Sequence, residues 1–146
     1  MITLRVAKIE DLIELAGNAM DPGIDTRPEE VHKWATMNMD SGPAYTALSE
    51  GRAIASFGVR LTRPGVGLVW LVVSKDIDRT FAFLREGLFE ARTMIEVMAE
   101  KYELKKIRAV SRIGFGGSQR MLGRLGFERL RRHLKSCYVY RRRFLC

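Results

Sequence analysis

Apolar residues alternate with polar ones, or run together, in short segments that predict β-strands. The predicted strands are residues 2–6, 45–49, 53–61, 67–73, 105–110, 128–135 and 137–144. The stretch from Leu68 to Val73 reads LVWLVV, and a run without polar residues is typical of a central strand buried on both faces. Turn residues separate the second, third and fourth segments, so we expect these three to form an antiparallel meander.

Apolar positions spaced by three and four residues predict helices between these strands. The first helix covers Ile9 to Ala16. The second begins near Pro28, with Thr26 as the candidate N-cap, and ends before Ser41-Gly42-Pro43. Both helices follow the first strand, so they precede the meander in the chain.

The longest predicted helix covers residues 78–103. Its apolar stripe consists of Phe81, Leu84, Leu88, Ala91, Ile95, Met98 and Tyr102. A short helix that carries Met121, Leu122 and Leu125 comes later and ends at Gly126-Phe127, where glycine is a typical helix terminator.

The resulting element order is β-α-α-β-β-β-α-β-α-β-β, which predicts one α/β (α+β) domain over residues 1–146. We expect a mixed, mostly antiparallel sheet with the long helix packed on one side. The length of 146 residues and the 47% hydrophobic and 29% charged content suit an ordinary globular domain. No apolar run approaches the roughly 20 residues of a membrane span.

Cysteine and histidine are too sparse to predict a disulfide framework or a metal site. Cys137 and Cys146 are the only cysteines, and His32 and His133 are far apart in the sequence. We therefore expect no metal and a reducing, cytoplasmic setting.

The C-terminal third of the chain is strongly basic. Residues 105–146 carry thirteen Lys or Arg and a single acid, Glu128, whereas residues 1–104 hold more acids than bases. Such a surface suits an acidic protein, a CoA-like cofactor, nucleic acid or an anionic membrane, but it can also be a solvated basic strand pair. No helix-turn-helix or RNA-binding signature is present, so sequence-specific nucleic-acid recognition is not expected.

Charges on the last two strands cannot all share one surface. Arg131 and Arg132 are consecutive strand residues, as are Arg141 and Arg142, and consecutive strand residues point to opposite faces. We expect an electropositive edge that serves to dock an acidic partner or to make loose nucleic-acid contacts.

The segment from Ala109 to Glu128 combines a strand end, a glycine-rich turn and a short helix. Gly114, Gly116 and Gly117 form the turn. A strand, a glycine turn and a helix N-terminus together can bind a phosphate. The same pattern also fits a tight strand-to-helix connection, and the residues alone leave both interpretations open.

The element order, together with GGSQRMLGRLGF at residues 116–127, resembles the GNAT superfamily of N-acetyltransferases. This resemblance implies that the fourth and fifth strands splay apart and that acetyl-CoA inserts between them. Leu71 and Val73 would then offer backbone groups to pantetheine. Ser111 would line the splay, and Ser118 would face the cofactor.

The residues depart from that family at the cofactor's diphosphate. The family uses a glycine-rich loop after the fourth strand, whereas residues 74–81 contain no glycine. Asp76 and Asp78 would repel a phosphate, although Lys75 and Arg79 could partly compensate as point charges. We therefore expect acetyl-CoA to bind weakly or not at all.

The catalytic groups of the family are also missing. Leu122 stands where many members have a tyrosine that acts as general acid, and residues 68–73 offer no titratable side chain as a base. No catalytic residue can therefore be named from the sequence.

Residues 70–110, with the nearby RMLGRLGF, also resemble the GNAT-like proteins of short-tailed phages, some of which are internal virion proteins. This likeness implies a host-cytoplasmic or virion location. Three function classes follow from these observations. They are an acyl-CoA N-acyltransferase with a degenerate loop, an inactive GNAT-like virion or host-interaction protein, and a basic binder of nucleic acid or anionic surfaces.

Overall fold

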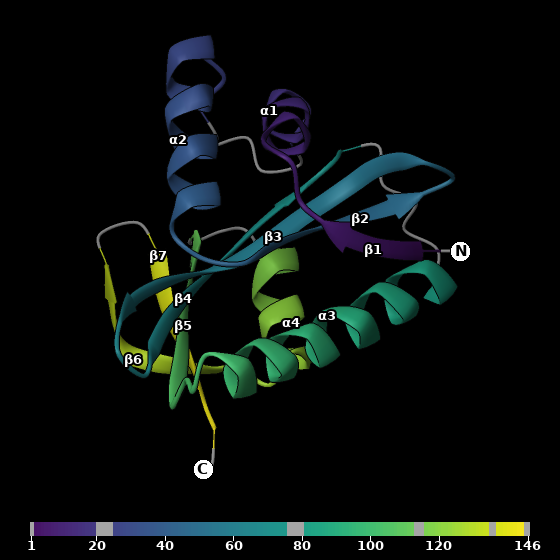
Figure 1. Ribbon diagram of the computed structural model, residues 1–146. Coiled ribbons are helices and arrows are strands. Elements are labelled where there is room, and N and C mark those ends of the chain that lie inside the picture. Colours follow the sequence, from purple (N-terminus) through teal and green to yellow (C-terminus); the bar gives the residue numbers. More distant parts are fainter. Residues whose placement is uncertain (1, 20–24, 76–80, 113–115, 135–136, 145–146) are drawn as a thin grey trace. The chain divides into compact units, whose positions relative to one another are not determined.

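The computed structural model describes residues 2–19, 25–75, 81–112, 116–134 and 137–144. Its elements follow the expected order (Figure 1). They are β1 (Ile2–Val6), α1 (Ile9–Gly17), α2 (Pro28–Asp40), β2 (Ala44–Ser49), β3 (Arg52–Arg63), β4 (Val66–Val73), α3 (Phe81–Lys101), β5 (Lys106–Arg112), α4 (Gly116–Arg124), β6 (Glu128–Leu134) and β7 (Cys137–Arg143).

The strands form a seven-stranded sheet in the order β1-β2-β3-β4-β5-β7-β6. β1 pairs with β2, β2 with β3, β5 with β7 and β6 with β7, all in antiparallel register. β4 and β5 are parallel, as strands joined through a helix can be. The expected mixed, mostly antiparallel α/β fold is confirmed.

The chain divides into two compact units, which we describe separately. The first comprises residues 1–60 and 70–84, and the second comprises residues 61–69 and 85–146. The boundary passes through β4, so this strand contributes its end to the first unit and its beginning to the second.

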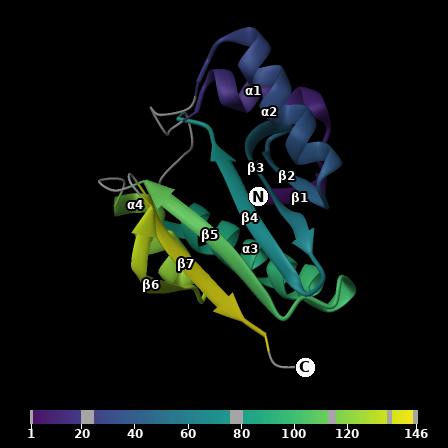
Figure 2. The same ribbon diagram turned by 90° about the vertical axis from the view of Figure 1, so that its left-hand side faces the viewer.

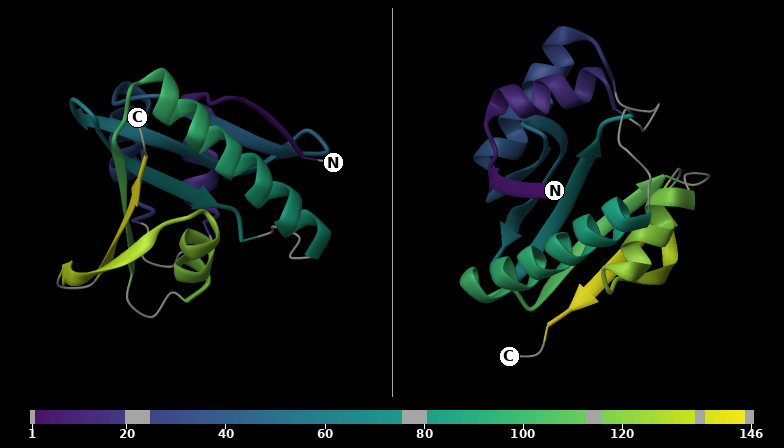
Figure 3. Two further views of the ribbon diagram at one scale, coloured as in Figure 1. Left: turned by 90° about the horizontal axis from the view of Figure 1, so that it is seen from below. Right: turned by 90° about the vertical axis from the view of Figure 1, so that its right-hand side faces the viewer.

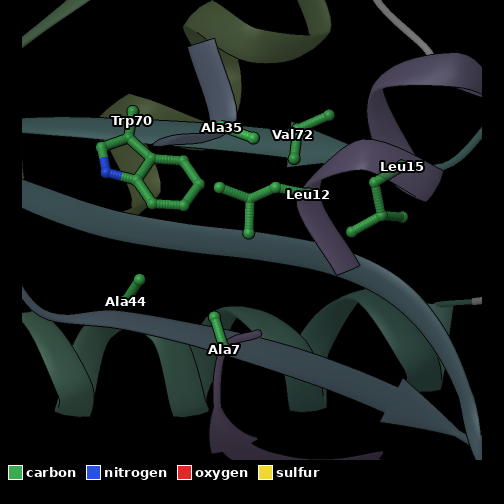
Figure 4. Packing of buried hydrophobic residues seen from close by; sticks show 7 residues of the cluster. All are labelled: Ala7, Leu12, Leu15, Ala35, Ala44, Trp70 and Val72. Carbon is green, nitrogen blue, oxygen red and sulfur yellow. The ribbon is translucent and has the colours of Figure 1, made fainter. Parts of the chain in front are cut away.

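In the first unit, α1 and α2 cover one side of β1, β2 and β3 (Figure 1). Leu12 and Leu15 of α1 and Ala35 of α2 pack with Trp70 and Val72 of β4 (Figure 4). The amphipathic spacing of the two helices puts these side chains on their inner faces, where burial stabilises the unit.

Gly58 of β3 allows the backbone to approach Trp70 closely. A Cβ at this position would lie 2.5 Å from the Pro43 carbonyl oxygen and 2.7 Å from Cζ2 of Trp70. Trp34 of α2 packs against Trp70 in a T-shaped arrangement, with 6.0 Å between the ring centroids. A residue without a side chain is therefore required here for the tryptophan to fit.

A buried polar cluster also ties α1 to the strands of the first unit. Asp11 accepts hydrogen bonds from both terminal nitrogens of Arg5, at 2.6 and 2.9 Å, and from the Lys8 backbone N–H. Its Oδ2 also accepts from the Thr46 hydroxyl, which lies 2.8 Å from the Ser56 hydroxyl. Asp11 is 7% exposed, and every contact just named satisfies a group that would otherwise lose water.

In the second unit, β5, β7 and β6 lie side by side (Figure 2), and α3 runs along one face of these strands (Figure 3). Arg142 of β7 donates to Glu96 of α3 at 2.7 Å. Ile95 and Met98 of α3 and Ile107 of β5 are almost fully buried. The long helix therefore has the apolar inner side that its sequence pattern predicted.

Two local expectations were wrong. β4 is not buried on both faces: Trp70 and Val72 are buried, but Leu71 between them is 40% exposed, so the strand alternates despite its uniformly apolar sequence. The N-cap of α2 is Arg27 rather than Thr26, and it makes no side-chain cap. Instead, the Asp25 carboxylate accepts the Arg27 N–H, while Pro28 starts the helix as expected.

Replacing Ile95 by alanine should lower the free energy of unfolding by about 2–5 kcal/mol, because Ile95 is 2% exposed and the change leaves a cavity. Val97→Ala, on the exposed side of the same helix at 46% exposure, is the matched control and should change little. Chemical denaturation of the two variants checks this. Equal stability of the variants would contradict the assigned inner face of α3.

The side chain of Leu88, which belongs to the same predicted stripe, lies outside the described residues.

The Asp11 cluster should make stability depend on acid. Burial alone would raise the pKa of Asp11, but hydrogen bonds from Arg5, the Lys8 N–H and Thr46 outweigh it and hold the pKa at about 2, below its ordinary 3.8. Because the pKa of Asp11 is lower in the folded state, its ionised carboxylate stabilises the fold above about pH 4. This contribution to the free energy of unfolding is lost as the pH falls towards about 2.

Asp11→Ala should therefore destabilise the protein at neutral pH by about 1–3 kcal/mol, because buried donors are left without an acceptor. The difference in free energy of unfolding between the variant and the wild type should shrink as the pH falls from 4 to 2. Urea denaturation across this range measures both effects. Parallel stability curves for the two proteins would show that Asp11 is not ion-paired in the folded state.

Candidate functional site

The end of β4 is the structural element on which the expected cofactor site depends. β4 has β3 as its hydrogen-bonded neighbour on one edge and β5 on the other. The parallel register described with β5 covers Val66↔Lys106, Gly67↔Ile107 and Leu68↔Arg108. β4 itself continues to Val73, and its residues from Trp70 onwards belong to the first unit.

The two faces of this strand end differ within the first unit. Trp70 and Val72 point into the core formed with α1 and α2. Leu71 and Val73, the two expected cofactor-binding residues of the strand, share the opposite face, and Leu71 is 40% exposed. The packing of Trp70 and Val72 thus determines which residues the strand presents on its other side.

Ser74 and Lys75, directly after β4, are fixed by backbone hydrogen bonds. The Ser74 N–H donates to the Ile54 carbonyl at 2.8 Å, and the Lys75 N–H donates to the Asn18 carbonyl at 2.9 Å. The Asn18 side-chain amide also donates to the Ser74 hydroxyl at 3.2 Å. Both N–H groups therefore have acceptors within the protein, which matters because a phosphate cradle is built from N–H groups without such partners.

Sequence reasoning missed this role of Asn18. Asn18 lies 56 residues before Ser74, at the C-terminal end of α1, and no local pattern connects the two. The pairing of Ala19 with Ser74 as an isolated antiparallel bridge is equally non-local.

The other expected site residues belong to other parts of the chain. Ser111 lies in β5, opposite Tyr138 of β7, and Ser118 lies in the first turn of α4. Both are in the second unit, and their side chains are outside the described part of the structure. Arg79 also lies outside it. The roles expected for these three residues stay predictions from the resemblance.

The helix end at Gly126-Phe127 is confirmed. The Phe127 N–H donates to the Leu122 carbonyl at 3.0 Å, the Gly126 N–H donates to the Gly123 carbonyl at 3.1 Å, and Gly126 has a φ of +91°. This is the Schellman arrangement, in which glycine is favoured because its φ is positive. Gly114 falls outside the described residues, so the phosphate interpretation of the preceding turn stays a prediction.

Leu122 is a packing residue rather than a proton donor. It is 8% exposed, and Phe127, whose backbone binds it, is 6% exposed. β4 carries no ionisable side chain at all. Neither the helix position expected for an acid nor the strand expected for a base supplies a group that transfers protons.

Two other classes of site find no support within the described ranges. No group of three or more His, Cys, Asp or Glu residues there could hold a metal ion. Among the helices described, none is both long enough and apolar enough to cross a membrane.

Solved acetyltransferase structures share this fold. A protein assigned as a phosphinothricin N-acetyltransferase superposes with a TM-score of 0.75 at 14% identity, covering 99% of each chain. A GNAT acetyltransferase from Streptococcus pneumoniae gives 0.69 at 12% identity, over 99% of this chain and 100% of that one. The aminoglycoside acetyltransferase AAC(6')-Ib in complex with coenzyme A gives 0.69 at 18% identity, over 97% and 93%.

The protein therefore has the GNAT acetyltransferase fold over nearly its whole length. No protein-family model and no curated protein matches the sequence. At such low identity the likeness shows the fold, and the activity has to be argued from the residues.

Gly123, near the C-terminal end of α4, and Gly126, just after the helix, should respond to alanine with stability changes of opposite sign. Gly126→Ala should destabilise the protein by about 1–2 kcal/mol, because an L-residue is strained at positive φ. A Cβ there would also lie 3.0 Å from Nε of Arg142. Gly123→Ala has open space around the new Cβ and lies within the helix, so it should stabilise by about 0.5–1 kcal/mol. Thermal unfolding of both variants checks this, and a shift in the same direction would refute the helix end described above.

Proposed function

We propose that the protein is an acyl-CoA-dependent N-acyltransferase that holds its cofactor mainly through the backbone of β4. One observation supports this proposal: the described ladder of β4 with β5 covers Val66, Gly67 and Leu68, whereas β4 itself continues to Val73. Where a strand edge beyond such a ladder is open, it can add an extended amide-containing ligand as it would add another strand. The pantetheine part of CoA is such a ligand.

The chain's own residues favour a proximity mechanism. Bound acyl-CoA would supply a thioester, whose acyl group passes to an amine while the thiol leaves. β4 would orient that ligand through N–H and C=O groups that require no particular side chains. Since neither β4 nor Leu122 offers a proton donor or acceptor, we assign no acid or base, and the amine's proton passes to water.

The diphosphate part of CoA fits less well than pantetheine. The N–H groups of Ser74 and Lys75 are occupied by the Ile54 and Asn18 carbonyls, so these two positions offer no cradle. Lys75 is exposed and can attract a phosphate only as a point charge. We therefore infer a weakly held cofactor whose affinity comes mostly from its pantetheine arm.

A second candidate is a GNAT-fold protein without acyltransferase activity, acting as a virion or host-interaction component. The occupied N–H groups after β4 and the buried Leu122 favour it. The two candidates differ in one measurable property, which is whether pantetheine thioesters bind.

Calorimetric titration should compare acetyl-CoA with S-acetylpantetheine, which lacks the phosphates. We expect dissociation constants of about 0.1–1 mM for both, within about threefold of each other, because the phosphates add little. Lys75→Gln should weaken only the acetyl-CoA complex. Lys33→Gln, which removes another exposed charge, from α2, is the control and should leave both affinities unchanged.

Micromolar or tighter binding of acetyl-CoA, with much weaker binding of S-acetylpantetheine, would show that a phosphate site exists and that our reading of residues 74–75 is wrong. Absence of binding by both ligands would reject the acyltransferase proposal and leave the non-catalytic candidate.

A further inference from the structure

A basic groove lies in the second unit, where β4 begins. It has a volume of about 420 Å³, within the range of small-molecule sites. Four of its lining residues are cations from three separate segments: Arg63, Lys105, Lys106 and Arg143. None of the ion pairs found within the described residues involves any of these four.

Backbone hydrogen bonds hold these segments together. The Gly65 carbonyl accepts the Lys105 N–H at 2.8 Å and the Lys106 N–H at 3.2 Å. The Lys105 carbonyl in turn accepts the Phe144 N–H at 2.8 Å. These bonds therefore fix the backbone from which the cationic side chains of the groove extend.

The groove continues into a ladder of like charges on one sheet face. In the β5–β7 register, Lys106 lies opposite Arg143 and Arg108 lies opposite Arg141. Like charges directly opposite each other destabilise a sheet. Glu128, the only acid of residues 105–146, binds Arg141 at 2.9 Å and leaves the other three cations of the ladder without a carboxylate from this region.

The electrostatics of the face agree with an excess of positive charge. The pKa of Lys106 lies below its ordinary value, chiefly because Arg108 stands two residues along the strand. Loss of hydration is the next cause, followed by the further cations Arg63, Arg141 and Arg143. In addition, Nε of Arg108 is buried and finds no hydrogen-bond acceptor in the described part of the chain. An anion bound in the groove would offset the excess of positive charge around Lys106.

The neighbouring residues point to a compact anion rather than to a nucleic-acid strand. Strand binders combine basic grooves with aromatic side chains on which bases stack. On this face of β5 and β7 the ladder continues with Val110 and Val139, whereas Tyr138 and Tyr140 fall on the opposite face. Several cations in one small groove match the dense charge of linked phosphates.

We propose that this groove binds a compact oligophosphate group. Arg63 and Arg143 contribute planar guanidinium groups suited to phosphate oxygens, and Lys105 and Lys106 contribute point charges. The site lies where β4 begins, whereas the residues of the proposed cofactor site lie where β4 ends, so the two proposals are independent.

Inorganic tripolyphosphate is the probe, titrated calorimetrically into the full chain at low salt. We expect saturable binding of one ligand per chain that weakens as salt is raised. The double variant Arg63→Gln/Arg143→Gln should lose at least about tenfold in affinity. Lys33→Gln/Arg52→Gln removes the same net charge from exposed positions outside the groove and should bind as the wild type does.

Thermal unfolding without ligand supplies a second readout. Because the ladder is self-repelling, Arg63→Gln/Arg143→Gln should unfold at the same temperature as the wild type or at a higher one. A lower unfolding temperature would contradict the assigned repulsion.

Three results would overturn the proposal. These are no binding at low salt, equal weakening in the two double variants, and tighter binding of oligothymidylates that grows between about 10 and about 20 nucleotides. The last result would assign the face to a nucleic-acid backbone instead.

Discussion

The two-residue alternation of β4 is the constraint on which the other features of the first unit depend. Because Trp70 and Val72 must be buried under α1 and α2, Leu71 and Val73 have to occupy the other face. A shift of one residue would expose the tryptophan and bury the opposite set. The close approach of Gly58 to Trp70 reinforces this register, since the ring fits only where no side chain stands across from it.

Backbone and side-chain sites survive sequence change to different extents. This chain shares the GNAT fold with acetyltransferases to which it is only 12–18% identical. Strands and their hydrogen-bonding edges are therefore kept even when most residues differ. A backbone edge needs no particular residues, whereas a diphosphate loop needs glycines and a general acid needs a titratable group. This chain keeps the first feature and lacks the residues for the other two. The proposed weak, phosphate-independent cofactor binding would follow from that difference.

The sequence predicted the elements and the fold class, because periodicity and helix terminators such as Gly126 are local signals. It could not predict the exposure of Leu71, since a uniformly apolar strand hides its alternation until the neighbouring helices are known. Nor could it predict the partners of the Ser74 and Lys75 N–H groups, which come from distant residues. The basic groove could not be predicted from the sequence for the same reason. The excess of charge was visible, but only the strand register and the Gly65 contacts bring Arg63 beside Lys105 and Arg143.

The hydrogen bonds from Lys105 and Lys106 to Gly65 also have a kinetic consequence. They join residues about forty positions apart, so the whole of α3 must be enclosed before they form, and closing so long a segment has an entropic cost that hairpins such as β2–β3 avoid. We therefore expect the groove to be completed after the local turns have formed. A ligand that occupied the groove would bind only the folded chain, and it would therefore shift the folding equilibrium towards the structure in which these distant residues meet.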